Sequence, residues 1–210
     1  FEPELCETIT KDLQNNNSFY LLDEYCNALT LDYEETFALL KMMICSVDFV
    51  STSTVTHIIS TAFHAVEIAK LEKLSETDVD EVFTGALLHD LGKMAIDVNI
   101  LESSGQLTDE QMEIMRGHVK KGDEMYRGIV GNKLADIASR HHENLDGSGY
   151  PYGIKGAELT PQQRILSIAD VFSALTDART YKPSFYKEKT LSIMAEMAEN
   201  HKLDPLILKH

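Results

Sequence analysis

The feature that most constrains the fold is a helical spacing of apolar residues behind recognisable helix starts. From Val79 to Leu87, apolar side chains return every three or four residues behind a candidate N-cap at Ser75. The predicted helix ends near His89 and Asp90, where Gly92 is expected to take the turn. Strict alternation of apolar and polar residues, the pattern of a half-buried strand, is not sustained anywhere in the sequence. The chain is therefore predicted to be all-α.

Two further helix starts have the spacing of a capping box, in which Ser or Thr precedes Glu or Gln by three residues. Thr108 with Gln111 predicts one helix, and Thr160 with Gln163 predicts another that has Pro161 at its first position. Their expected apolar faces are Met112, Met115, Val119, Gly122 and Tyr126 in the first, and Ile165, Ile168, Ala169, Phe172 and Leu175 in the second. A last helix through residues 191–197 and loops over residues 94–105 and 144–159 are also expected.

The composition excludes several classes of function. With 43% hydrophobic and 25% charged residues, the chain is typical of a soluble globular protein. A formal charge of −15 disfavours binding to a nucleic-acid polymer, because phosphate-backbone binders usually present a basic face. The most apolar segment, FALLKMMICSVDFV, is interrupted by Lys41 and Asp48, so no membrane span is expected.

The cysteines favour a reducing compartment. Cys6, Cys26 and Cys45 form an odd number without a CxxC pair. This pattern argues against a disulfide framework and against a thiolate metal site, and it predicts a cytoplasmic protein.

Histidines and aspartates recur in one order on the predicted helices or at their ends. Imidazole and carboxylate are ligands for first-row divalent metals such as Fe, Mn, Zn and Ni. Seven such groups exceed what one ion takes, so two ions are expected, with an aspartate able to bridge them. The groups are His57, His89, Asp90, His118, His141, His142 and Asp170.

The stretch HHENLDGSGYP, at residues 141–151, and the upstream LLHDLGK resemble the HD-GYP branch of the HD-domain metallophosphohydrolases. The resemblance continues through ILESSGQLTDEQ, RILSIADVFSALTDARTYKP and HKLDP. It implies an HD-domain helical bundle over residues 49–210. Residues 1–48 are then a short helical segment that serves as a linker, a dimerisation element or the tail of a sensor. A homodimer and an upstream sensor or receiver domain remain open.

The resemblance also implies a reaction. Family members hydrolyse cyclic di-GMP to linear pGpG, and often onward to GMP, through attack of a metal-bridging hydroxide. The implied cofactors are two divalent ions, Fe or Mn first, with Zn, Ni or Co as alternatives. All seven histidines and aspartates match the metal ligands, and Asp90 is the expected bridge. Asp90 and Lys93 match catalytic positions, while Lys93, Tyr150, Arg179 and Lys182 match substrate contacts.

Two features of the sequence depart from the family pattern. Members that hold three metals have a glutamate one turn before the first histidine, where this chain has Ser53. Two metals are therefore predicted. The usual lysine and proline before GxLT are replaced by Ser103 and Ser104, which removes a positive charge from a loop near the site. The choice between cyclic di-GMP and a hybrid such as cyclic GMP-AMP is expected to depend on this loop.

Other interpretations stay open at this level. Taken singly, His57 and His118 are more typical of hydrogen-bonded core histidines, and only their place in the ordered set favours ligation. His64 is expected to be structural or exposed, and His201 and His210 solvated. Glu143 and Asp146 are assigned to orienting the histidines, with loop solvation as the alternative. A receptor that binds a cyclic dinucleotide without turnover, or a hydrolase of simpler nucleotide phosphates, is the rival function.

Overall fold

The computed structural model describes residues 42, 52–103, 105–177 and 186–209. Apart from residue 42, the predicted N-terminal segment 1–48 lies outside the described residues, and so do Arg179 and Lys182. No strand occurs in the described part, which confirms the all-α prediction. Its elements are α4 (Thr52–Leu71), α5 (Glu76–Leu88), η1 (Leu91–Ala95), α6 (Val98–Leu101), α7 (Asp109–Arg116), α8 (His118–Ser139), η2 (Gly156–Glu158), α9 (Pro161–Thr176) and α10 (Lys187–Glu199).

Local capping sets the helix starts as predicted. The Ser75 hydroxyl accepts a hydrogen bond from the Asp78 amide at the start of α5. Thr108 and Gln111 form a reciprocal capping box on α7, and Thr160 and Gln163 form the same box on α9. Each box satisfies amides that the first turn of a helix leaves without a partner.

The helix expected after Thr108 is in fact two helices. The Gly117 amide is shared between the carbonyls of Glu113 and Ile114, which tightens the last turn of α7, and α8 begins at the next residue. α8 is itself interrupted at Gly131, whose φ of 79° is non-helical. The predicted loops 94–105 and 144–159 also contain the short elements α6 and η2, so the prediction of plain loops was incomplete.

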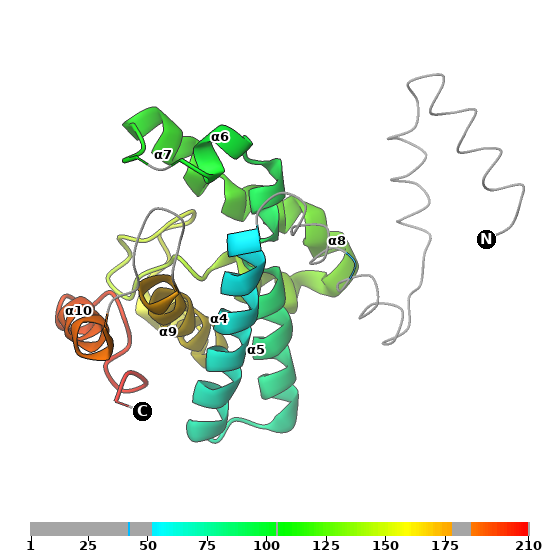
Figure 1. The fold of residues 1–210 in the computed structure, drawn as a ribbon. Coiled ribbons are helices and arrows are strands. Elements are labelled where there is room, and N and C mark those ends of the chain that lie inside the picture. Colours follow the sequence, from blue (N-terminus) through cyan, green and yellow to red (C-terminus); the bar gives the residue numbers. More distant parts are fainter. Residues whose placement is uncertain (1–41, 43–51, 104, 178–185, 210) are drawn as a thin grey trace, which may run out of the picture. The chain divides into compact units, whose positions relative to one another are not determined.

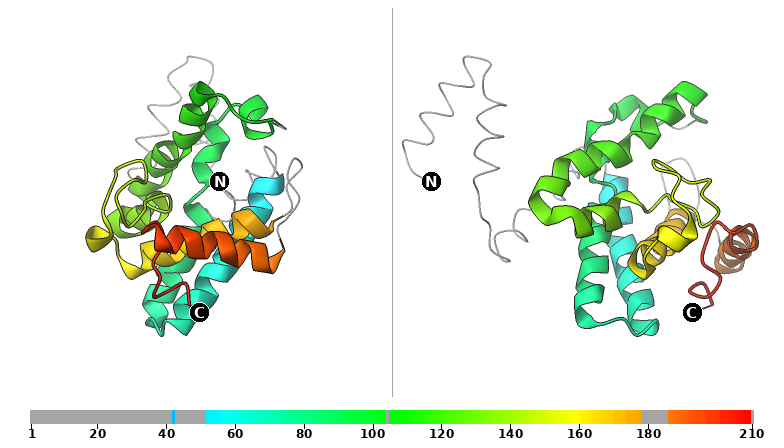
Figure 2. Two further views of the ribbon diagram at one scale, coloured as in Figure 1. Left: turned by 90° about the vertical axis from the view of Figure 1, so that its left-hand side faces the viewer. Right: turned by 180° about the vertical axis from the view of Figure 1, so that it is seen from behind.

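The core is built around α4 and α5, which lie antiparallel and side by side (Figure 1). α9 packs against α4, α8 packs against α5, and α10 lies on the outer side of α9, as the rotated views also show (Figure 2). On α4 the buried positions Ala62, Ala65 and Ala69 carry small side chains. These let the neighbouring helices approach closely, so that larger residues such as Leu166 and Met194 fill the core. None of the described helices has the length and apolarity required to cross a membrane.

Gly92 permits the closest backbone contact near the predicted site. A Cβ on Gly92 would lie 1.9 Å from the His118 carbonyl oxygen and 2.4 Å from the Gly122 amide nitrogen. Both atoms are backbone, so neither can turn away. Gly92 is therefore required for η1 to pack on α8, rather than for the turn that the sequence suggested. This contact fixes the distance between the HD pair and His118.

Replacing Gly92 by alanine is expected to destabilise the fold by about 3 kcal/mol, because the backbones of η1 and α8 must separate. For a chain of this size the melting temperature should fall by about 6–12 °C. Gly128, which lies on α8, is the matched control: a Cβ added there would have nothing within 4 Å. Gly128→Ala should be neutral or stabilising by about 1 kcal/mol through helix propensity. Thermal melts of both variants check this, and equal melting temperatures would contradict it.

Candidate metal centre

The seven predicted ligands converge in the fold, although they come from five separate segments. His57 lies within α4, and His89 and Asp90 follow the last turn of α5. His118 opens α8, Asp170 lies within α9, and His141 and His142 follow the end of α8. All are buried except His142, which is half-buried. Their roles as ligands remain a prediction, but the sequence order has become one spatial cluster.

Three of the imidazoles are oriented by backbone carbonyls. The Nδ1 atoms of His89, His118 and His141 each lie 2.7 Å from a carbonyl oxygen three residues earlier, at Ala86, Met115 and Ala138. A carbonyl oxygen only accepts, so Nδ1 must be the protonated nitrogen in each ring. The Nε2 atoms of these three histidines are therefore left with a free lone pair, as a metal ligand requires.

His57 is oriented by a carboxylate instead. Its Nδ1 lies 3.3 Å from Asp177 Oδ2, and its Nε2 lies 2.9 Å from Asp170 Oδ1. Asp177 was not among the predicted site residues. It stands in the same motif as Arg179, but nothing in the sequence ties it to a histidine 120 positions earlier.

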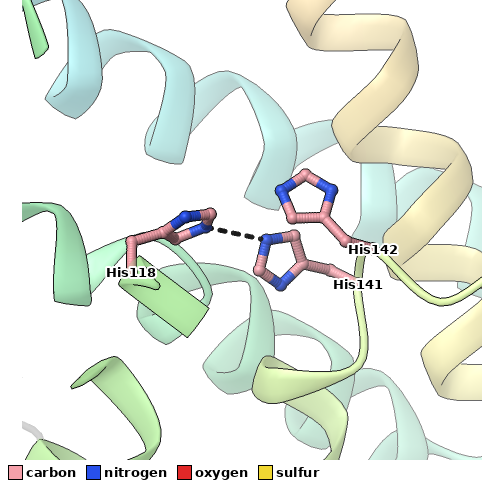
Figure 3. A group of neighbouring side chains, drawn as sticks. All are labelled: His118, His141 and His142. Atoms are coloured by element: carbon pink, nitrogen blue, oxygen red, sulfur yellow. Dashed lines mark hydrogen bonds between the residues drawn. The ribbon is translucent and has the colours of Figure 1, made fainter. Parts of the chain in front are cut away.

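The ligand atoms fall into two groups, each within 4.8 Å. One comprises His57, His89 and Asp90, and the other comprises His118, His141 and His142. Figure 3 shows the second group, in which the His118 and His141 rings face each other from the start of α8 and from the segment that follows it. Two groups agree in number with the predicted pair of ions.

Two aspartates connect the groups. Asp90 Oδ2 lies 3.4 Å from His89 Nε2 and 3.6 Å from His57 Nε2, while its Oδ1 lies 3.3 Å from His118 Nε2. Asp170 does the same with Oδ1 at 2.9 Å from His57 Nε2 and Oδ2 at 3.6 Å from His142 Nδ1. Each carboxylate thus offers one oxygen to each group, which is the arrangement of a bridging ligand.

The protein atoms alone leave this cluster unsatisfied. His89 Nε2 is buried and makes no hydrogen bond. The Nε2 atoms of His118 and His141 lie 3.5 Å apart, although both carry lone pairs rather than protons. Two buried acceptors at this distance repel unless a cation or a proton lies near them. The donor set therefore fits divalent transition metals.

The charge states of the cluster also suit a metal. Burial, together with the neighbouring imidazoles, lowers the pKa of His141 well below its usual value, and burial lowers the pKa of His142 to about 3. Both rings are thus neutral at physiological pH, the form that binds metals. Burial alone would raise the pKa of Asp90, but the Lys93 ammonium beside it helps to outweigh burial and to hold that pKa well below the usual value. The carboxylate is therefore ionised and available.

His57 carries the opposite perturbation. Burial lowers its pKa, but the hydrogen bonds to Asp170 and Asp177 outweigh burial and raise it to about 9. In the absence of a metal, His57 is therefore an imidazolium held between two carboxylates. A metal ion that takes Nε2 displaces this proton, so metal binding at this group is coupled to proton release.

A cavity of about 310 Å³ lies over the cluster. Its polar side is formed by candidate ligands and by Lys93, whose Nζ lies 2.5 Å from Asp90 Oδ2. Its apolar side comes from the α6–α8 region and α9: Leu101, Leu107, Met112, Met115 and Ala174. Charged groups on one side and an apolar wall on the other suit a ligand that has both a phosphate and an aromatic ring.

Tyr150, a predicted substrate contact, lines the same cavity. Its ring stacks on His142, with 4.6 Å between centroids, and the Arg116 guanidinium lies 5.4 Å from the tyrosine ring centroid. Arg116 was not predicted. Cation–π contact and stacking together hold Tyr150 against a candidate ligand.

The loop that carries HHENLDGSGYP is tied to itself by Glu143. The Glu143 carboxylate accepts hydrogen bonds from the Tyr152 and Ile154 amides, at 2.7 and 2.9 Å, and Asp146 accepts one from the Ser148 amide. The expectation that Glu143 and Asp146 orient the histidines is therefore corrected: both shape the loop. A buried carboxylate that binds two amides sets the path by which Tyr150 reaches His142.

The remaining histidines agree with the structural interpretation. His64 packs edge-on against Phe172, with 4.8 Å between ring centroids, and belongs to neither of the described groups of ligand atoms. His201 is exposed, and His210 lies outside the described residues.

Comparison with known families matches this geometry. A family model described as HD domain matches residues 38–207. The chain belongs to the HD domain family. HD-domain phosphohydrolases depend on metal ions, and the two groups of ligand atoms agree with that requirement. The family match begins before residue 49, the predicted start of the domain.

Curated relatives of this HD domain are named for the hydrolysis of cyclic dinucleotides. The chain is 39% identical over 130 residues to the cyclic di-GMP phosphodiesterase response regulator RpfG of Xanthomonas campestris. This alignment covers 60% of the chain and 34% of that protein. The chain is also 34% identical over 218 residues to 3′3′-cGAMP-specific phosphodiesterase 2 of Vibrio cholerae. This second alignment covers 100% of the chain and 42% of that protein. The chain thus spans between a third and a half of the length of these relatives.

A solved structure shows the same fold. A HDG"Y"P protein from Bdellovibrio bacteriovorus superposes with a TM-score of 0.62 at 16% identity, over 84% of this chain and 62% of that one. The predicted HD-GYP resemblance and the helical HD fold are confirmed.

Proposed function

We propose that this HD domain is a metal-dependent phosphodiesterase that hydrolyses cyclic di-GMP to linear pGpG. The observation that carries the proposal is the pair of ligand groups joined by Asp90 and Asp170 beneath a cavity. Phosphodiester hydrolysis needs an activated water and neutralisation of phosphate charge at the same point, and a bridged pair of metal positions serves both. The named activities of the RpfG and Vibrio cholerae relatives support the same class of substrate.

Different residues of the site would bind the metal ions, the phosphate and the base. His57, His89 and Asp90 would hold one ion, His118, His141 and His142 the other, with Asp170 between them. Two bound divalent ions supply Lewis acidity and a nucleophile at neutral pH. Lys93 keeps Asp90 ionised and offers its remaining N–H donors toward the cavity, where a phosphate oxygen can accept them. The apolar wall around Met112 and Met115 excludes water and offers a surface for a base.

The number and identity of the ions are part of the proposal. Two ions fit two groups of ligand atoms, and Ser53 offers no carboxylate for a third. Four of the five histidines present Nε2 to the cluster, so nitrogen donors dominate, which favours iron or manganese over magnesium. Zn, Ni and Co have compatible ligand preferences.

A hybrid cyclic GMP-AMP is the alternative substrate. A cGAMP-specific relative matches this chain along its whole length, and Ser103 stands where the family usually places a lysine. We propose cyclic di-GMP first because RpfG shows the higher identity.

The test is turnover by the manganese- or iron-loaded protein, with cyclic di-GMP, 3′3′-cGAMP and cyclic di-AMP in parallel and products separated by chromatography. We expect pGpG as the first product and cyclic di-GMP as the fastest substrate. At least tenfold faster cleavage of 3′3′-cGAMP would reassign the substrate while keeping the reaction class. Tight binding of cyclic di-GMP without product from any of the three would support a receptor and overturn the phosphodiesterase.

We also propose domain bounds, a cellular compartment and partner domains for this chain. Residues 49–210 would be the catalytic unit and residues 1–48 a helical linker, dimerisation element or sensor tail. The cysteine pattern and a nucleotide substrate suit the cytoplasm. An upstream sensor or receiver domain and a homodimer are compatible with relatives of which this chain spans less than half the length.

A further inference from the structure

We propose that Asp177 is a positioning residue that orients His57 and strengthens it as a ligand, so that the two metal positions differ in how they depend on this carboxylate. The inference rests on the proposed function, because it concerns the metal pair of that site. Asp177 contacts the cluster through His57 Nδ1, the ring nitrogen that faces away from Asp90 and Asp170.

The position of His57 in its helix explains why it needs such a partner. A helix leaves the carbonyls of its last turn without an amide donor. His89, His118 and His141 each follow the end of a helix, and each has its Nδ1 2.7 Å from a carbonyl of that last turn, at Ala86, Met115 and Ala138. His57 stands in the interior of α4, Thr52–Leu71, where the preceding carbonyls are occupied by amides four residues on. Its Nδ1 therefore requires a side-chain acceptor from another element.

Asp177 is fixed in place to serve as that acceptor. It caps the C-terminus of α9, where its amide donates to the Ser173 carbonyl at 2.8 Å. Its Oδ1 accepts a hydrogen bond from Ser60 Oγ at 3.1 Å, while Oδ2 faces His57 Nδ1 at 3.3 Å. Ser60 lies on α4 three residues after His57, so one helix face presents both partners to the same carboxylate.

A carboxylate does more than a carbonyl at this position. Its charge makes the imidazole a stronger electron donor, and loss of such a partner typically weakens metal binding about 10–100-fold. The effect should be confined to the group of His57, His89 and Asp90, because His118 and His141 in the other group are oriented by backbone carbonyls. Removal of the Asp177 carboxylate should therefore weaken the binding of one of the two metal ions.

The experiment is a titration of the metal-free protein with Mn²⁺ against a competing chelator, which needs no substrate. Asp177→Ala should leave one equivalent at wild-type affinity and weaken the other about 10–100-fold. Asp177→Asn keeps an oxygen that accepts a hydrogen bond from His57 Nδ1 but lacks the negative charge. It should therefore lose less metal affinity than Asp177→Ala. Ser60→Ala removes the hydrogen bonds of Ser60 to Asp177 and Ser173 but leaves the Asp177 carboxylate in place, so it should show the smallest loss of metal affinity.

Asp136→Asn is the matched control. Asp136 is a partly exposed carboxylate that pairs with Arg127 and Arg140 and contacts none of the candidate ligands. The Asp136→Asn variant should bind both equivalents of Mn²⁺ with wild-type affinity. If Asp177→Ala fails to fold, the Asn and Ser60 variants still decide the question, with circular dichroism melts as the check.

The role of Asp177 would be overturned if Asp177→Ala and Asp177→Asn both bound two equivalents of Mn²⁺ with wild-type affinity. It would also be overturned if the affinity for both equivalents fell equally. Failure of the wild type to bind any metal would overturn it together with the proposed function. A wild type that binds two ions but cleaves no cyclic dinucleotide would overturn only the proposed function, since the titration would still report on Asp177.

Discussion

Replacing Asp90 by asparagine is expected to reduce cyclic di-GMP hydrolysis by about a thousandfold or more. Asp90 is 1% exposed and offers Oδ2 to His57 and His89 and Oδ1 to His118. Asparagine keeps the shape but has one oxygen and no charge, so it cannot bridge two ions. A metal ion contributes several kcal/mol of charge stabilisation in a transition state, which corresponds to about three powers of ten in rate.

The measurement is kcat/KM for cyclic di-GMP, together with metal content on the same samples. Asp90→Asn should bind fewer than two equivalents. Asp204→Asn is the control, because Asp204 is also a buried carboxylate in an ion pair, at 2.8 Å from Arg164, but touches none of the candidate ligands. Its activity per folded molecule should stay near the wild-type value. Wild-type turnover and metal content in Asp90→Asn would exclude Asp90 as the bridge.

Removal of the metals is expected to abolish turnover and to lower the melting temperature. Without a cation, His89 Nε2 has no hydrogen-bond partner, and the Nε2 atoms of His118 and His141 face each other at 3.5 Å. An ion that binds only the folded state stabilises it by about 2.7 kcal/mol at a concentration a hundredfold above its dissociation constant. For a chain of this size that corresponds to a rise of about 5–10 °C per ion.

Differential scanning calorimetry of chelator-treated protein, before and after addition of Mn²⁺, measures this shift. Mg²⁺ at the same concentration is the control, because it prefers oxygen ligands and retains its water shell. It should give a much smaller rise. Restored turnover with Mn²⁺ on the same sample would link the stability to the reaction. An unchanged melting temperature with Mn²⁺, or an equal rise with Mg²⁺, would contradict a site dominated by imidazole nitrogen.

Much of this protein could be predicted from its sequence, because the relevant signals are local. The caps at Ser75, Thr108 and Thr160 depend on contacts within three residues, and each was confirmed. The ordered histidines and aspartates, with the HD and GYP motifs, led to the family that the comparisons show. The structure brings all seven candidate ligands together.

Some local predictions failed where glycine intervened. Gly117 divides the segment after Thr108 into α7 and α8, although its apolar spacing continues through this glycine. Glycine lowers the cost of leaving the helix, so periodicity alone does not fix continuity. Gly92 was expected to make a turn, and instead it allows two backbones to touch.

The sequence by itself determined the helices, the family and the set of candidate ligands, since these follow from residue types at short and regular spacings. Only the tertiary structure decided which partner orients His57 and which groups the Glu143 carboxylate binds. His57 meets Asp177 across 120 residues because α9 packs along α4, and Glu143 turns to the loop amides because the loop folds back over it. A contact of this kind depends on how two elements pack, and neither residue's neighbours in the chain carry that information.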